Sequence, residues 1–342
     1  MNDMTLPALG ETHIALSHGN GGRMMRELIE RVFGAELHNP LLDTGADAVA
    51  VPTEAGAELV LTTDGFTVQP LEFPGGDIGS LAVHGTVNDL AVSGAEPRYL
   101  TLSAFLEEGL EVAKLRRLVA SAARAARDCG VVVVAGDTKV VGRGECDGAY
   151  FAVTGVGFRA PGVRLGFDRI QPGDRVLVTG PVGDHGAAVM LAREEFGLRG
   201  DLKSDAAGVL PLARALLGVP GLRFMRDPTR GGLATVCHEI VRATGRGLRL
   251  REAAIPVRDA VQSVCELLGY DPLYLACEGR IVAVVGAAHA DAALAAVRAL
   301  APGAALIGEV AAMPAPQVVL ATSFGGERVL DELEDDPLPR IC

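Results

Sequence analysis

The sequence has no tryptophan, and aromatic residues make up only 4% of its 342 residues. It also lacks a run of about 18 uncharged apolar residues, the length that a membrane-spanning helix needs, so no membrane span is expected. No basic segment followed by an apolar core opens the chain, so no secretory signal peptide is expected. The six cysteines are scattered, without a CxxC pair or a zinc-type spacing. We therefore expect a reduced, disulfide-free, cytoplasmic protein.

A basic balance of charge is also missing. The formal net charge of −12 disfavours a nucleic-acid partner, which normally needs a basic face. The GxxxxGK[ST] signature is absent, which excludes a Walker-type P-loop, and no GxGxxG opens a helix after a strand, which disfavours a dinucleotide site. An acidic protein can still bind ATP when its carboxylates hold Mg²⁺ against the phosphates.

What the chain does have is the composition of a globular enzyme, with 49% hydrophobic and 22% charged residues. Its length predicts about two domains. We expect an α/β unit over residues 1–160, a second over residues 161–330, and a tail over residues 331–342. The 43 glycines indicate tight turns or backbone that lies close to ligands.

Hydrophobic patterns in both units alternate between strand-like and helix-like segments. In the first unit, strands are predicted at 58–63, 131–135 and 150–156, and helices at 79–93 and 111–129. In the second unit, strands are predicted at 174–179 and 280–285, and helices at 231–243 and 290–300.

Three aspartates, Asp64, Asp89 and Asp137, follow apolar segments of the first unit. Ligand groups of α/β proteins gather at strand ends, and carboxylates that meet there repel one another unless a cation lies between them. Hard oxygen ligands suit Mg²⁺ and phosphate. A single aspartate in such a place is more often a turn or cap residue, but three in similar settings favour a metal site.

Two further segments combine charge with glycine. Residues 227–232 bring Asp227 and an arginine to Gly231 and Gly232 at a predicted helix start, an arrangement that suits phosphate or Mg²⁺. Lys139 follows Asp137 in a predicted turn, where partial burial would lower its pKa and make it a candidate base. Glu278 precedes a predicted strand.

The chain ends on a cysteine, Cys342, in an acidic and then proline-containing tail. Proline disfavours a helix there, so we expect an extended, mobile arm that carries its thiol between sites. A frayed terminus that happens to end in cysteine is the alternative, since chain ends are often poorly ordered. Arg340 is the nearest cation that can lower the pKa of the thiol.

Together these segments resemble the HypE family of hydrogenase maturation factors, from about residue 13 to the end. The closing motif PRIC (339–342) is the most specific to that family, whereas the internal motifs are shared with aminoimidazole ribonucleotide and selenophosphate synthetases. The internal motifs are SHGNGG (17–22), FPGGDIG (73–79), Asn88-Asp89, GDTKV (136–140), GDHG (183–186) and DPTRGG (227–232).

The resemblance implies a two-domain, α+β and α/β aminoimidazole ribonucleotide synthetase-like fold. In that fold the N-terminal sheets of two subunits pair across a homodimer, and the C-terminal domain is an α/β sandwich. It also implies that the carbamoyltransferase HypF loads a carbamoyl group onto Cys342. The enzyme then dehydrates this group with ATP and Mg²⁺ to a thiocyanate. The cyano group passes to a HypC–HypD complex and becomes a cyanide ligand of the [NiFe]-hydrogenase iron.

By the same resemblance, Cys342, Lys139 and Glu278 are the catalytic residues, with either Lys139 or Glu278 as the base. The metal ligands would be Asp64, Asp89 and Asp137. The nucleotide would be bound by Asp47, Asp64, Asn88, Asp89, Asp137, Asp227, Gly231 and Gly232.

Two other functions compete with this interpretation. A small-molecule kinase or synthetase of the same superfamily would keep ATP turnover after loss of Cys342. Selenophosphate synthetases usually carry a reactive residue near the N-terminus, whereas the first cysteine here is Cys129. A non-catalytic scaffold would tolerate Lys139→Ala and Asp89→Asn.

Overall fold

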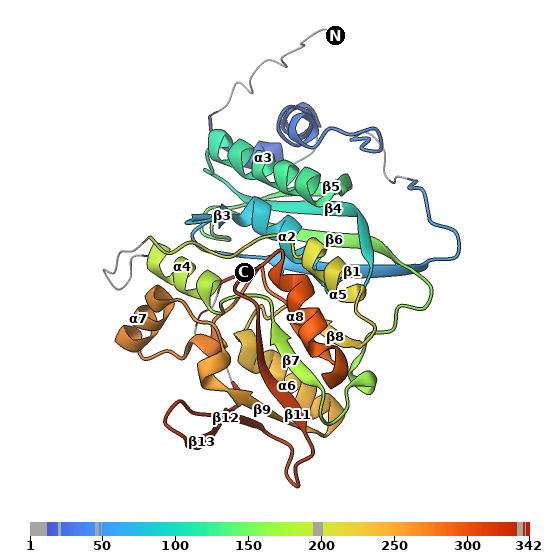
Figure 1. The fold of residues 1–342 in the computed structure, drawn as a ribbon. Coiled ribbons are helices and arrows are strands. Elements are labelled where there is room, and N and C mark those ends of the chain that lie inside the picture. The colour runs from blue at the N-terminus through green and yellow to red at the C-terminus, as the bar shows by residue number, and fades with distance from the viewer. Residues whose placement is uncertain are drawn as a thin grey trace.

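The structure is a computed structural model that describes residues 12–19, 22–44, 48, 50–193, 201–333, 338 and 340–342. Within these residues the main strands form two mixed sheets, of four and seven strands. We call them the N-terminal sheet and the C-terminal sheet. They lie one above the other in Figure 1, with the C-terminus between them. Among the described residues, no helix is both long enough and apolar enough to span a membrane.

The N-terminal sheet has the strand order β1-β6-β4-β5. Neighbours pair antiparallel, except β4 and β5, which are parallel. Two helices, α2 and α3, pack on one face of the sheet and against each other. The elements of this region are α1 (Gly22–Leu28), η2 (Ile29–Gly34), β1 (Glu58–Phe66), β2 (Glu72–Phe73), β3 (Gly76–Asp77), α2 (Ile78–Val92), β4 (Glu96–Glu107), α3 (Val112–Cys129), β5 (Val132–Val141) and β6 (Ala149–Arg159).

The other face of the N-terminal sheet is open to solvent in this chain. Along β1, side chains alternate between a more buried and a more exposed face, as expected for a strand with one covered side. Two leucines stand on the exposed face, Leu59 with 56% and Leu61 with 61% of their surface accessible. Phe105 of β4 adds a third exposed apolar side chain. The open face is therefore unusually apolar for a solvated surface.

The C-terminal sheet has the order β13-β12-β9-β11-β7-β10-β8. Buried valine-rich strands such as β7 and β10 form its centre, with helices around it. The elements of this region are β7 (Arg175–Val178), α4 (Asp184–Ala192), α5 (Leu210–Leu217), β8 (Leu222–Arg226), α6 (Gly232–Thr244), β9 (Gly247–Arg251), α7 (Asp259–Leu268), β10 (Val282–Val285), α8 (Ala290–Arg298), β11 (Ala305–Ala311), β12 (Val318–Ala321) and β13 (Glu327–Val329).

Helix α2 joins the two regions. Its middle is buried against the N-terminal sheet, while Ala91 and Val92 near its C-terminus belong to a core cluster with α5, β8 and β10 of the second region. Asn88, one turn earlier, is also buried. Because α2 packs against both regions, it holds its buried polar residue Asn88 against the C-terminal region.

The predicted helices at 79–93, 111–129, 231–243 and 290–300 correspond to α2, α3, α6 and α8. The strands predicted at 58–63, 150–156, 174–179 and 280–285 also form. One local prediction was wrong, because residues 136–139 lie inside β5 and not in a turn after it. Asp89 lies inside α2, within the helix predicted at 79–93.

Candidate functional site

A small cavity of about 50 Å³ lies where the two regions meet the end of the chain. We call it the carboxylate cavity, because four of its lining residues are acidic. It brings together segments that are more than 200 residues apart in the sequence. Its lining residues are Asp64, Gly65, Phe66, Gly85, Asp89, Asp227, Thr229, Arg230, Glu278 and Cys342.

Asp64 and Asp89 form the N-terminal side of the carboxylate cavity. Asp64 stands on the helix-covered face of β1, and Asp89 reaches it from α2. Thr62, two residues before Asp64 on the same face, donates its hydroxyl to Asp89 Oδ2 at 2.6 Å. Burial, together with the neighbouring Asp89, raises the pKa of Asp64 to about 6. The two carboxylates therefore repel each other when both are ionised.

Asp227 and Glu278 form the C-terminal side of the carboxylate cavity. Burial and then the charge of Asp89 raise the pKa of Asp227 to about 7. Glu278 has only 2% of its surface accessible, and burial followed by the nearby aspartates raises its pKa well above the ordinary value. Its Oε1 is buried without a hydrogen-bond partner among the described residues. A buried acceptor without a partner is costly, so this atom is available to a bound group.

These side chains fit Mg²⁺ bound together with phosphates. Among the residues that the structure describes, no group of three or more His, Cys, Asp or Glu is arranged to hold a metal ion by itself. Mg²⁺ in nucleotide sites usually takes only one or two carboxylates, with phosphate oxygens and water as its other ligands. The repelling pair Asp64 and Asp89 supplies such a set, and a cation there would relieve its repulsion.

A larger groove of about 450 Å³ adjoins the carboxylate cavity. It runs between β1, α2 and the segment 225–230, and Asp64, Asp89 and Asp227 line both spaces. Arg230 also lines both, and its charge lowers the pKa of Asp64 in partial opposition to burial. The groove therefore offers carboxylates and a cation on its walls, which suits a metal-bound polyphosphate.

Asn88 lies beside this site but has no free amide atoms. Its Nδ2 donates to the backbone carbonyls of Ala207 at 3.0 Å and Glu278 at 3.1 Å. Its Oδ1 accepts the backbone N–H of Val209 at 2.8 Å. Asn88 thus ties α2 to two loops of the C-terminal region, and its predicted contact with the nucleotide stays a prediction.

Gly231 and Gly232 begin α6 with positive φ angles of 70° and 58°. A side chain at position 232 would collide with the backbone oxygens of Leu275 and Leu273, 2.5 and 2.7 Å from an added Cβ. Close packing of the two loops therefore accounts for this glycine. Phosphate binding by both glycines stays a prediction.

Asp137 and Lys139 lie apart from the carboxylate cavity. Both point to the open face of the N-terminal sheet from β5, at the edge opposite β1. In the register, Asp137 aligns through Ser103 and Ala152 with Gly65, which places it three strand spacings, roughly 14 Å, from β1. Lys139 contacts Asp137 at 3.1 Å.

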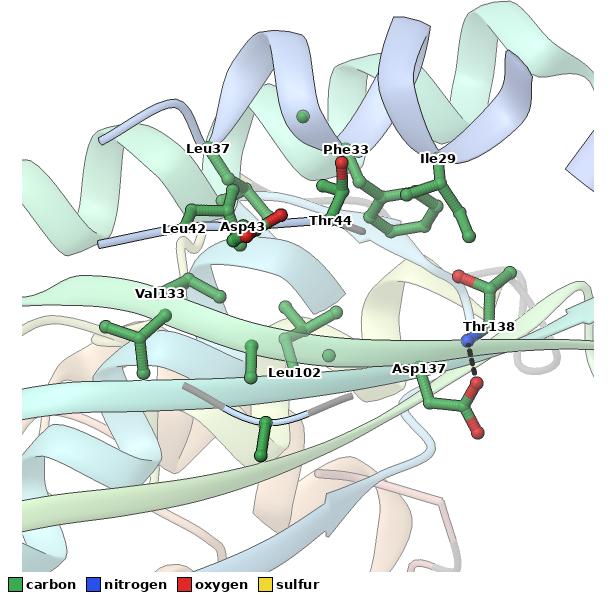
Figure 2. A pocket seen from close by; sticks show the side chains of 15 residues that line it. Ile29, Phe33, Leu37, Leu42, Asp43, Thr44, Leu102, Val133, Asp137 and Thr138 are labelled. Atoms are coloured by element: carbon green, nitrogen blue, oxygen red, sulfur yellow. Dashed lines mark hydrogen bonds between the residues drawn. The ribbon is translucent and has the colours of Figure 1, made fainter. Parts of the chain in front are cut away.

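The side chain of Lys139 is 56% accessible, so the partial burial predicted for it was wrong. Figure 2 shows Asp137 pointing away from a cavity of about 140 Å³ that Phe33, Leu37 and Val133 line on the other side of β5. Its carboxylate accepts the backbone N–H of Thr138. Of the other predicted nucleotide contacts, Asp47 lies outside the described residues.

The end of the chain docks beside the segment that follows β1. The carbonyls of Arg340 and Cys342 accept the backbone N–H groups of Gln69 and Thr67 at 3.2 and 3.3 Å, an antiparallel pattern. Ile341 is 2% accessible, and Cys342 lines the carboxylate cavity. Arg340 pairs with Asp147 at 2.6 Å. Cys342 and Glu278 therefore meet at one cavity although no sequence pattern links them.

Comparison with known proteins identifies the family. AIR synthase related protein, N-terminal domain, matches residues 45–158, and AIR synthase related protein, C-terminal domain, matches residues 171–321. Carbamoyl dehydratase HypE of Rhodobacter capsulatus is 49% identical over 339 residues, which cover 98% of this chain and 100% of that protein. This chain belongs to the HypE family of carbamoyl dehydratases. HypE of Escherichia coli (strain K12) is 44% identical over 336 residues, covering 96% and 99% of the two chains.

Solved HypE structures have the same fold. HypE in complex with ATP matches with a TM-score of 0.91 and 43% identity, over 96% of this chain and 99% of that chain. A chain of the HypE–HypF complex matches with a TM-score of 0.77 and 42% identity, over 90% and 99%. The predicted family and the predicted two-domain fold are thereby confirmed. The predicted enzyme class is also that of the family.

Sequence reasoning overlooked two functional candidates, whereas Arg230 was anticipated as the cation of the segment 227–232. Thr62 contacts Asp89, but a threonine in a strand gives no signal of its own. The second, His185, stands in the GDHG motif, which was noted only for its resemblance. Its contact with the tail depends on the folded chain.

Proposed function

We propose that this protein uses ATP to dehydrate a carbamoyl group on the Cys342 thiol to a thiocyanate, for the cyanide ligands of [NiFe]-hydrogenase. The observation that carries the proposal is the position of Cys342, which lines the same cavity as Glu278, Asp64 and Asp89. A group attached to this thiol would sit among carboxylates and beside the groove that suits a polyphosphate. The HypE relatives and the ATP-bound HypE structure support the same function.

The chemistry requires oxygen to leave an amide. Transfer of the γ-phosphoryl group of ATP to the amide oxygen of the S-carbamoyl cysteine converts that oxygen into part of a good leaving group. Loss of both N–H protons and departure of phosphate then turn the carbon–nitrogen bond into the nitrile of S-cyanocysteine. The sum is S-carbamoyl cysteine plus ATP giving S-cyanocysteine, ADP, phosphate and a proton. A base at the amide nitrogen is essential to this step.

We propose Glu278 as that base. Its buried Oε1 has no hydrogen-bond partner among the described residues and can face the substrate amide, and its raised pKa makes the deprotonated carboxylate a strong proton acceptor. Mg²⁺ held by Asp64 and Asp89 would neutralise developing charge on the phosphates. Arg230 would add a second cation at the same place.

The open face of the N-terminal sheet supports a homodimer. Its exposed leucines and phenylalanine need a cover, and the two outer strands, β1 and β5, each have only one strand partner among the residues that the structure describes. We propose that two copies pair these faces and edges into a closed barrel. Pairing of β1 with the partner's β5 would bring the second copy's Asp137 and Lys139 to the edge of β1, on the face of the sheet that lines the inside of the barrel. The metal and catalytic roles predicted for these two residues then require the dimer.

We propose HypF as the donor of the carbamoyl group and a HypC–HypD complex as the acceptor of the cyano group, in the cytoplasm. The HypE–HypF complex supports the first partner. The division into domains at 1–160 and 161–330 with a mobile tail at 331–342 belongs to the same proposal. A thiol that must visit HypF, the carboxylate cavity and an acceptor needs such a tail.

Intact-protein mass spectrometry with peptide mapping tests this function. The protein is incubated with HypF, carbamoyl phosphate and ATP, with and without Mg²⁺, and the C-terminal peptide is examined. A carbamoyl mass on Cys342 that becomes a cyano mass only with Mg-ATP is expected, and Cys342→Ser should show neither. An unmodified Cys342, while a HypE of known activity is labelled in parallel, would overturn the proposal.

A further inference from the structure

The docked tail is held by its backbone. Apart from the pairing with Thr67 and Gln69, the carbonyl of Arg340 accepts a hydrogen bond from Arg193 Nη2 at 2.7 Å. The carbonyl of Ile341, the residue before the terminal cysteine, accepts from His185 Nε2 at 2.7 Å. Arg340 itself has a φ of 55°, a left-handed conformation that is unfavourable for a non-glycine residue. The hydrogen bonds from Arg193 and His185 can stabilise the tail in this conformation.

The contacts of His185 fix the direction of each hydrogen bond. A carbonyl only accepts, so Nε2 carries the proton and donates to Ile341. Burial lowers the pKa of His185 to about 4, so the ring is neutral and Nδ1 accepts. Ser204 Oγ, 2.7 Å away, must then donate to Nδ1. The same Oγ accepts the backbone N–H of Ala206 at 3.0 Å.

The imidazole is fixed in place. His185 is completely buried at the start of α4, and the ring of Phe73 packs edge-on against it at 5.4 Å between centroids. The N–H of Ser204 donates to the carbonyl of Pro74 at 2.8 Å, which anchors the serine as well. Because Phe73 and Ser204 hold the imidazole in place, its Nε2–H points toward the tail.

The loop that contains Ser204 also supports Glu278. Asp205 Oδ1 accepts the backbone N–H of Glu278 at 3.1 Å. The carbonyl of Ala207 accepts from Asn88, the residue that holds the carbonyl of Glu278. One short segment, residues 204–207, therefore contacts both the histidine at the tail and the proposed base, Glu278. The position of Cys342 and the position of Glu278 are set by the same loop.

We propose that His185 is a positioning residue. By donating a hydrogen bond to the backbone carbonyl of Ile341 in the docked tail, it holds the Cys342 thiol at the carboxylate cavity. Because the bond goes to a backbone carbonyl, it does not depend on whether the sulfur is free or carries a small group. It thus serves the loaded and the unloaded tail alike. Its consequence for catalysis rests on the proposed function, whereas its effect on docking does not.

Two substitutions separate the two ends of the imidazole. Glutamine places an amide N–H near the position of Nε2, so His185→Gln keeps the donor to Ile341. Asparagine places its polar atoms near Nδ1, so His185→Asn keeps the contact with Ser204 and loses the tail. The measurement is the alkylation rate of Cys342 by iodoacetamide in the full-length protein, followed by mapping of the C-terminal peptide. Cys237, which is fully buried, serves as the indicator of an intact fold.

We expect His185→Asn to raise the alkylation rate of Cys342 at least severalfold and His185→Gln to stay within twofold of wild type. Equal rates in all three proteins would overturn the proposal, and so would a parallel rise in both variants. If neither variant folds, Ser204→Ala is used; it leaves the ring but removes the donor that fixes its tautomer. An unchanged Cys342 rate in that variant would also overturn the proposal.

A second readout concerns turnover. With HypF and Mg-ATP, His185→Asn should be carbamoylated at least as fast as wild type but cyanated at least tenfold more slowly, and His185→Gln should recover cyanation. A merely structural defect would slow both steps together. Failure of wild-type Cys342 to take up a carbamoyl group would count against the proposed function and leave the alkylation result intact.

Discussion

The side-chain amide of Asn88 donates a hydrogen bond of 3.1 Å to the backbone carbonyl of Glu278, 190 residues further along the chain. Together with its bonds to Ala207 and Val209, this contact joins a helix of the N-terminal region to the loop that carries the presumed base. It explains how a glutamate outside any regular element keeps a defined place. Glu278 is therefore only as well positioned as the asparagine that holds its backbone.

Asn88→Ala should destabilise the protein and impair catalysis, and its effect on nucleotide binding tests the contact predicted for Asn88. Removing the amide leaves two carbonyls and one N–H unpaired in a buried place, which we expect to lower the free energy of unfolding by about 2–4 kcal/mol. The turnover number for cyanation should fall more than tenfold, because Glu278 loses its brace. Urea denaturation, turnover and calorimetry with Mg-ATP measure the three effects.

Asn39→Ala is the matched control. Asn39 also makes three hydrogen bonds to backbone, with Leu37, Leu41 and Val133, but it lies far from Glu278 in the first region. This variant should lose stability and keep its turnover number. Equal losses of turnover in both variants would show that Asn88 acts through stability alone.

Asp89→Asn should weaken Mg-ATP binding at least tenfold, because the pair that faces the phosphates loses one of its two charges. The neutral side chain keeps an oxygen that can accept from Thr62, so the local fold should persist. Isothermal titration calorimetry gives the affinity. An unchanged affinity would remove Asp89 from the site.

The same variant should gain stability, with a defined dependence on pH. The pKa values of Asp64 and Asp227, raised to about 6 and 7, mean that the folded protein keeps protons that the unfolded chain releases near pH 4. Stability from these groups is therefore complete below pH 4 and is lost as the pH rises to 7. The charge of Asp89 contributes to raising both pKa values, so Asp89→Asn should reduce this loss of stability at high pH. Its Tm should exceed that of wild type without ligand at pH 8, and the difference should vanish at pH 5.

Glu278→Gln should stop the dehydration without stopping ATP binding. The amide has nearly the same shape but cannot take up a proton, so the rate of cyanation should fall by about 10²–10⁴. Carbamoyl-Cys342 should then accumulate and be seen by mass spectrometry of the C-terminal peptide. Normal cyanation in this variant would leave Lys139 of the partner subunit as the better candidate for the base.

Leu61→Asp should break the proposed homodimer. Leu61 stands on the open face of the N-terminal sheet, where a charge would face the apolar surface of a second copy. Sedimentation velocity should show a shift from dimer to monomer. Leu300→Asp is the control, because Leu300 is similarly exposed, at 56%, but lies just after α8, far from that sheet. A monomeric wild-type protein would contradict the dimer itself.

The sequence by itself determined the family, the fold and most of the helices. The amphipathic pattern of α3 and the continuous apolar strands are local signals, and motifs such as DPTRGG and PRIC carry identity without any geometry. Asp89, Asp227 and Cys342 stand in such motifs. Asp64 was chosen because it follows an apolar run and Glu278 because of the resemblance, and the fold brings all five to one cavity. The chemical role of each of these residues could therefore be predicted from the sequence.

Only the tertiary structure decided which of the predicted site residues lie together at the carboxylate cavity. Strand register places Asp137 and Lys139 on the other face and the other edge of the sheet, because side chains alternate along a strand and β5 continues through them. Likewise, burial makes Asn88 a brace for Glu278 and His185 a neutral donor to the tail. Contacts across more than 100 residues depend on packing, which no local pattern contains.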